Sequence, residues 1–127
     1  MQGEAYFSLN VSWSDFKPER SLGNTLKMGY LLKQGDRRKN WKRRWFVLDK
    51  GSRLMYYDSK ETYDAGGSPL NSVDVLGSVV IEKETGRQNL IALETAKRTF
   101  YMCGDSHEQK VAWKDALMEA GATSTAL

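Results

Sequence analysis

One short segment of the sequence concentrates positive charge in a way that suits a polyanionic ligand. Between positions 33 and 44 the chain has seven basic residues and one acid, Asp36, so this segment carries a net charge of +6. The remaining 12 basic and 15 acidic residues give the rest of the chain a net charge of −3. A concentrated positive segment on a mildly acidic body indicates a polyanionic partner more strongly than overall basicity does. Its basic residues are Lys33, Arg37, Arg38, Lys39, Lys42, Arg43 and Arg44.

The pattern around this segment predicts a β-hairpin whose loop carries the charge. Short apolar runs bounded by turn signals predict strands over 28–33 and 45–48, and Gly35-Asp36 breaks the first of them. Lys33 and Arg44 then stand at the facing ends of the two strands, so their cationic groups can converge at the mouth of the loop. Arginine offers a two-pronged donor to phosphate oxygens and lysine offers a compact charge. Tyr56, on a third predicted strand over 54–57, could add a hydroxyl donor.

The rest of the chain predicts further short strands and one final helix. The strands are expected over 72–75, 78–82, 89–94 and 98–103, after a long polar excursion over 59–69. Beyond them, Trp113, Leu117 and Ala120 recur at helical spacing on one face. The pairs Asp105–Glu108 and Ser106–Gln109 both have capping-box spacing, so the helix should begin here, and Gly121 should end it. Seven strands followed by one amphipathic helix are therefore expected.

The N-terminal residues carry a separate pattern. Apolar residues alternate with polar ones over 6–13, which predicts one more strand with an apolar face. Since a lone strand cannot bury such a face, it should add to an edge of the domain, cover an open corner or belong to a partner. The expected organisation is an N-terminal extension over 1–26, a domain over 27–120 and a tail over 121–127.

Composition excludes several classes of function. No stretch approaches 18 consecutive apolar residues and the N-terminus lacks a signal pattern, so we expect neither a membrane span nor a secretory signal. One cysteine, Cys103, and one histidine, His107, leave no set for a structural metal site, and we expect no metal and no cofactor. His107 lies beside Asp105 and Ser106, but a catalytic triad must converge in space, and helix capping explains these neighbours. We expect no catalytic residue and no enzyme activity.

Three motifs in this order resemble the pleckstrin homology (PH) domain family. Segment 29–35 (GYLLKQG) is similar to the first strand of that family, and segment 41–48 (WKRRWFVL) is similar to its second. Trp113 in the last helix resembles the family's C-terminal tryptophan. The first hairpin also resembles PH domains of cytohesin-type and SWAP-type GTPase exchange factors. The resemblance implies a mainly β fold, a seven-stranded sandwich or barrel of two near-orthogonal antiparallel sheets that one C-terminal α-helix caps.

The resemblance also implies a ligand. PH domains bind inositol phosphate head groups of membrane lipids with the loop between the first two strands. The family's motif for 3-phosphorylated inositides is matched here by Lys33, Arg37, Lys42, Arg44 and Tyr56. Arg38, Lys39 and Arg43 are expected to add long-range attraction. We therefore expect a phosphoinositide-binding module that recruits its parent protein from the cytoplasm to the plasma membrane or to another membrane with these lipids.

Two positions depart from the family's motif. Leu70-Asn71 stands where the tightest binders often place a basic residue, and Asp36 stands where glycine is common. Both departures predict weaker affinity and looser selectivity for a trisphosphate head group.

Two other classes of function stay open at this point. The same fold can serve as a protein-interaction module, for which a small GTPase is a candidate partner and the 6–13 strand and the 59–69 excursion are candidate surfaces. Nucleic-acid binding through the basic loop is the other class. The mildly acidic remainder of the chain argues against it, because a nucleic-acid binder spreads basic residues along a track.

Overall fold

A long hairpin, β1–β2, organises the fold. The computed structural model describes residues 22–82 and 86–125. The strands are β1 (Thr25–Gln34), β2 (Trp41–Asp49), β3 (Arg53–Tyr57), β4 (Asn71–Asp74), β5 (Val79–Ile81), β6 (Leu90–Glu94), β7 (Thr99–Cys103) and β8 (Thr123–Ser124). The helices are a 3-10 turn (Leu22–Asn24), α1 (Lys60–Asp64) and α2 (His107–Glu119). The strand expected over 6–13 lies outside the described residues.

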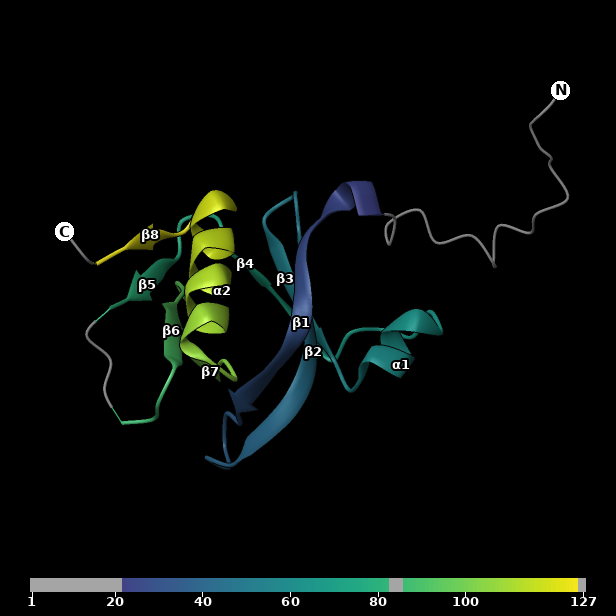
Figure 1. The fold of residues 1–127 in the computed structure, drawn as a ribbon, viewed down its shortest axis with the longest axis horizontal. Helices are drawn as coiled ribbons and strands as arrows, with labels where there is room; N and C mark the ends of the chain where they lie inside the picture. Colours follow the sequence, from purple (N-terminus) through teal and green to yellow (C-terminus); the bar gives the residue numbers. More distant parts are fainter. Residues whose placement is uncertain (1–21, 83–85, 126–127) are drawn as a thin grey trace, which may run out of the picture.

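The described strands form one continuous sheet with a seam in its middle. Their order is β4-β3-β2-β1-β7-β6-β5-β8. β1 pairs with β2 along almost its whole length but with β7 only at Leu32 and Lys33. Figure 1 shows the curved β1–β2 hairpin in the middle of the molecule, with α2 on one side of it and α1 on the other. The expected fold class is confirmed, and β8 adds a short parallel strand beside β5.

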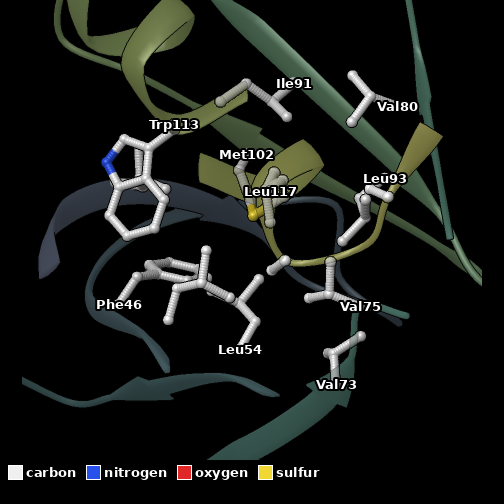
Figure 2. Close-up of a cluster of buried hydrophobic side chains, with 14 of the residues drawn as sticks. Phe46, Leu54, Val73, Val75, Val80, Ile91, Leu93, Met102, Trp113 and Leu117 are labelled. Atoms are coloured by element: carbon white, nitrogen blue, oxygen red, sulfur yellow. The ribbon is translucent and has the colours of Figure 1, made fainter. Parts of the chain in front are cut away.

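The main core fills the space between the two halves of the sheet and α2. Trp113 and Leu117 are each 1% exposed and point from α2 into this core (Figure 2). The Trp113 ring lies edge-on to Phe46 of β2, with their centroids 6.3 Å apart. Cys103 is buried at the end of β7, as expected for a small apolar side chain. The apolar helix face that the sequence predicts is therefore the face that closes the core.

Specific hydrogen bonds fix where α2 begins and ends. The Ser106 hydroxyl accepts a bond from the Gln109 backbone N–H at 3.1 Å, and the Gln109 side chain accepts one from the Asp105 N–H at 2.5 Å. Of the two predicted capping pairs, the helix thus uses Ser106–Gln109. Gly121 has φ +113°, a conformation that side chains disfavour, and it ends the helix as predicted. The chain then turns back so that β8, in the expected tail, pairs with β5.

The expectation of a plain loop over 59–69 is wrong, because this segment contains α1. The Ser59 hydroxyl caps α1 by accepting a bond from the Thr62 N–H at 3.1 Å. Tyr63 of α1 is buried and lies edge-on to Tyr57 at 5.1 Å between centroids. Together with Trp45 and Val47 these tyrosines form a second apolar cluster, on the outer face of the β1–β3 half. A five-residue helix is too short for periodicity to reveal.

Adjacent residues of α2 allow a test of this packing. We expect Leu117→Ala to lower the free energy of unfolding by about 2–5 kcal/mol, because it leaves a cavity in the core. Met118→Ala is the matched control and should change it by about 0.5 kcal/mol or less, because Met118 is 39% exposed. Urea denaturation followed by circular dichroism measures both. Equal losses for the two variants would contradict the placement of this helix face.

Candidate functional site

The register of the β1–β2 hairpin places three of the expected cations on one face of the sheet. Arg44 pairs with Leu31 and Lys42 pairs with Lys33. Directly paired residues of antiparallel strands share a face, and so do residues two apart on one strand. Phe46, which is buried in the main core, is therefore on the same face as these cations. On the inner face of the hairpin, the row of buried apolar side chains is therefore followed directly by a row of basic ones.

Four of the five expected ligand-binding residues line one hollow of about 180 Å³, at the end of the sheet where the β1–β2 loop lies. We call it the basic hollow. Tyr56 reaches it from β3, since Tyr56 pairs with Phe46. Leu70 lies at its rim, at the position where the sequence departs from the family's motif. The lining residues are Lys33, Gly35, Asn40, Lys42, Arg44, Tyr56 and Leu70.

The loop beside the basic hollow depends on a glycine. The Gly35 N–H donates to the Asn40 carbonyl at 2.8 Å and closes the loop. A Cβ at position 35 would lie 2.3 Å from the Arg38 carbonyl oxygen, which is shorter than any real contact. Only glycine therefore fits here without moving the backbone. Arg37, Arg38 and Lys39 are exposed in this loop, so the structure does not bring Arg37 into the hollow.

Lys33 is the most unusual of the cations because it is only 9% exposed. Its Nζ donates to the Gln34 carbonyl at 3.1 Å and lies 4.9 Å from the centroid of the Tyr56 ring. Among the described residues no carboxylate forms an ion pair with it. Burial lowers the pKa of Lys33, and the charges of Arg98 and Arg44 lower it further, while Asp36 partly opposes them. An anion beside Lys33 would relieve this unfavourable environment.

Arg44 already has an internal partner. Its Nη1 lies 2.8 Å from the Oδ1 of Asp58, which follows β3 directly. The Arg44 side chain is 21% exposed and that of Asp58 is 66% exposed. The remaining donors of the guanidinium can still face the basic hollow. No local sequence pattern indicates Asp58, because only the register between β2 and β3 brings it beside Arg44.

A second arginine, Arg98, approaches Lys33 from the other side. Its guanidinium lies 4.1 Å from the centroid of the Phe100 ring, and Lys33 Nζ lies 5.8 Å from the same centroid. Arg98 and Lys33 together line a small hollow of about 30 Å³. Arg98 forms an ion pair with Asp36 of the β1–β2 loop at 2.5 Å. No local sequence pattern indicates Arg98 either, because the turn between β6 and β7 is distant from Lys33 along the chain.

Arg43, one of the expected supporting cations, lies on the other face of the hairpin. Its guanidinium stacks on the Tyr30 ring, 3.7 Å from the centroid. Trp41 is the first residue of β2, and the Arg87 guanidinium lies 4.8 Å from the centroid of its ring. Both residues therefore pack against the outer face and stay outside the basic hollow.

A larger hollow of about 580 Å³ adjoins the site on the side of Arg98. Its charged lining residues are of both signs, with Arg53, Lys97 and Arg98 opposed by Asp36 and Asp74. Mixed charge at an open surface gives an anion less attraction than the one-signed basic hollow does. The basic hollow is therefore the better candidate for an anion site.

Two further findings concern the described residues only. No group of three or more histidine, cysteine, aspartate or glutamate side chains in 22–82 and 86–125 is placed to hold a metal ion. No helix in these ranges is both long enough and apolar enough to cross a membrane.

Comparison with known proteins gives a consistent result. The sequence model of the PH domain matches residues 25–122. The chain is 32% identical over 102 residues to "Differentially expressed in FDCP 6 homolog" of Xenopus laevis, and this match covers 80% of this chain and 17% of that protein. It is 33% identical over 94 residues to Switch-associated protein 70 of Bos taurus, and this match covers 74% of this chain and 16% of that protein. The chain thus spans less than a fifth of the length of these relatives. The expected SWAP-type likeness is confirmed, whereas the cytohesin-type likeness stays a prediction.

A solved structure agrees with the sequence relatives. The C-terminal PH domain of pleckstrin, crystallised in complex with D-myo-Ins(1,2,3,4,5)P5, matches with a TM-score of 0.64 and 34% sequence identity. The match covers 76% of this chain and 98% of the pleckstrin chain.

The buried ammonium of Lys33 leads to a prediction about stability. We expect Lys33→Met to be as stable as the wild type at pH 7, or more stable by up to about 1 kcal/mol, because a buried charge is replaced by an apolar side chain of similar length. The pKa of Lys33 is lower in the folded than in the unfolded chain. The unfolded chain therefore binds more protons just below the ordinary lysine pKa, and wild-type stability should rise with pH there. The free energy of unfolding of Lys33→Met should lack this rise with pH.

Urea denaturation measures the effect at pH 7 and at about pH 9.5, and the second value lies just below the usual pKa of lysine. Lys39→Met is the matched control, because it removes the same charge from an exposed loop position. A Lys33→Met variant less stable than this control by more than about 1 kcal/mol would mean that the contacts of Lys33 stabilise the fold.

Proposed function

The chain belongs to the PH domain family, and on this premise we propose that it binds the inositol phosphate head groups of membrane lipids in the basic hollow. Lys33, Lys42, Arg44 and Tyr56 would contact the phosphates, and Arg37 would join them from the loop. The proposed ligands are phosphoinositides, with 3-phosphorylated isomers favoured. Binding would recruit the parent protein to the cytoplasmic face of the membrane that carries them.

One observation carries this proposal: three cations and a hydroxyl converge on one hollow at the end of the inner face. Arg44 can present parallel N–H donors to two phosphate oxygens, and Lys42 can follow a phosphate as a mobile point charge. Lys33 is shielded from water, so its attraction for an anion is stronger than that of an exposed lysine. The site therefore suits several phosphate groups held at fixed spacing on one ring.

The relatives support the same ligand chemistry. The pleckstrin domain that resembles this chain was crystallised with an inositol pentakisphosphate. We transfer this ligand class to the present chain because the cations of the basic hollow have the chemistry that it requires. Binding alone would carry out the proposed role, so no catalytic residue is assigned.

The exposed loop cations have a second role in this proposal. Arg37, Arg38 and Lys39 are exposed and stand next to the basic hollow. Each basic residue near an anionic leaflet contributes about 1 kcal/mol, and the attraction falls off within a Debye length. The loop would draw the domain to the membrane before a head group enters the hollow. The chain spans only part of its relatives, so the activity that is recruited would reside in the rest of the parent protein.

Removing the guanidinium from the basic hollow tests the pocket. We expect Arg44→Ala to weaken binding of its preferred inositol phosphate by about 10- to 100-fold, because charge-assisted hydrogen bonds to phosphate are lost. Calorimetric titration with a panel of soluble inositol phosphates at physiological salt measures this. Arg53→Ala is the matched control, since Arg53 is exposed and lies outside the basic hollow, where it donates to the Ser72 hydroxyl. This control should bind like the wild type.

Two outcomes would count against the proposed pocket. Affinity that follows phosphate number alone, and that Arg44→Ala and Arg53→Ala lower equally, would reduce the site to a non-specific patch. Binding to a partner protein that survives Arg44→Ala would point instead to a protein-interaction module, with a small GTPase as a candidate partner.

Removing one charge from the loop separates attraction from recognition. We expect Arg38→Gln to weaken binding to phosphoinositide-containing anionic vesicles by about fivefold, because one charge contributes about 1 kcal/mol near the leaflet. Its affinity for soluble inositol phosphates should change by less than about twofold, since Arg38 is exposed and lines neither hollow, and exposed charges are largely screened. Vesicle co-sedimentation and calorimetry on the same samples measure the two effects. Equal losses in both assays would place Arg38 inside the binding site.

A further inference from the structure

Both arginines beside Lys33 are already bound to aspartates, and this pairing suggests how the site is regulated. Arg44 pairs with Asp58 at 2.8 Å and Arg98 pairs with Asp36 at 2.5 Å. Both carboxylates are largely exposed, at 66% and 70% of their side-chain surface. Each carboxylate occupies guanidinium donors that a phosphate bound at the same place would need.

We propose that Asp36 and Asp58 act as internal counter-ions of the anion site, which a ligand with phosphates on both sides of Lys33 must displace. The proposal rests on the proposed function, since it concerns the same ligand class. It adds Arg98 to the residues that contact phosphate. It also assigns to the two aspartates the role of lowering affinity for ligands with few phosphates.

The geometry around Lys33 supports a two-sided site. The basic hollow lies on the side of Arg44, and the small hollow that Lys33 shares with Arg98 lies on the other. The Phe100 ring contacts both Arg98 and Lys33, so the two cations are held close together, and Asp36 lines the small hollow with them. A phosphate beside Lys33 can therefore reach either arginine once its aspartate moves away.

The ion pairs are suited to displacement because they are exposed. An exposed ion pair contributes little to stability, since water and salt screen it and its side chains lose freedom on pairing. A phosphate group with two negative charges competes well against one carboxylate for the same guanidinium. The carboxylates can swing into water when they are replaced, because more than half of their surface is already solvated.

The test is to neutralise each aspartate in the full chain. We expect Asp36→Asn and Asp58→Asn each to raise the affinity for a soluble inositol pentakisphosphate about two- to fivefold, the range that one exposed ion pair accounts for. Asp64→Asn is the matched control, because it makes the same charge change and also breaks an ion pair, the one with Lys60 on α1 at 2.7 Å. Calorimetry at fixed salt should show less than a twofold change for this control.

A double-mutant cycle separates a counter-ion from a general change of charge. We expect Arg98→Ala to lower the affinity, and Asp36→Asn to have no effect once Arg98 has been replaced. A gain from Asp36→Asn that persists in the Arg98→Ala background would overturn the role of this ion pair. Gains no larger than that of Asp64→Asn would overturn the proposal for the aspartate concerned.

The same experiment distinguishes the two hypotheses. Wild-type binding that Arg44→Ala abolishes and that neither aspartate variant improves would keep the proposed function and refute the counter-ion role. No binding of any inositol phosphate by the wild type or by any variant would refute the proposed function, and the counter-ion role with it.

Discussion

The register of the β1–β2 hairpin is the constraint on which the rest of the molecule depends. The continuous apolar run of β2 is buried on both faces: Phe46 and Leu48 enter the main core, while Trp45 and Val47 enter the outer cluster. A slip of one residue would exchange the two faces and ruin both clusters at once. The burial of both faces of β2 therefore fixes the register of the hairpin. Because Arg44 continues the phase of Phe46, the same packing that forms the two cores also fixes where the cation points.

The seam between β1 and β7 explains why a lysine can be buried at this place. β1 pairs with β7 only at Leu32 and Lys33, so the two halves of the sheet are not paired along the rest of β1. Lys33 thus stands at the last covered position of the inner face, where its stem is shielded and its ammonium meets Tyr56 and Phe100. Stability alone would favour an apolar side chain there. The lowered pKa of Lys33 has the same origin, since desolvation disfavours the charged form of the ammonium.

Local patterns predicted most of this architecture, and long-range register accounts for what they missed. Short apolar runs and turn residues located the hairpin, and helical spacing located Trp113 and Leu117, because both signals are contained in a few neighbouring residues. A family motif and strand phase both pointed to four residues that line the basic hollow, namely Lys33, Lys42, Arg44 and Tyr56. Asp58 and Arg98 were missed, since each reaches the site only through pairing with a distant strand. The helix α1 was missed because its short length left only a serine cap and one buried tyrosine as signals.

The two internal ion pairs connect the stability of the empty site with its affinity. Lys33, Lys42, Arg44 and Arg98 stand on adjoining parts of the inner face, and like charges that are held together raise the energy of the folded chain. Asp36 and Asp58 reduce this repulsion while no ligand is present. In the proposed function the same carboxylates would have to be displaced before phosphates bind, so whatever they add to the stability of the empty domain they would subtract from its affinity. Such a site would respond to the number of phosphates more steeply than a set of unpaired cations, because only a ligand that replaces both carboxylates would recover both arginines.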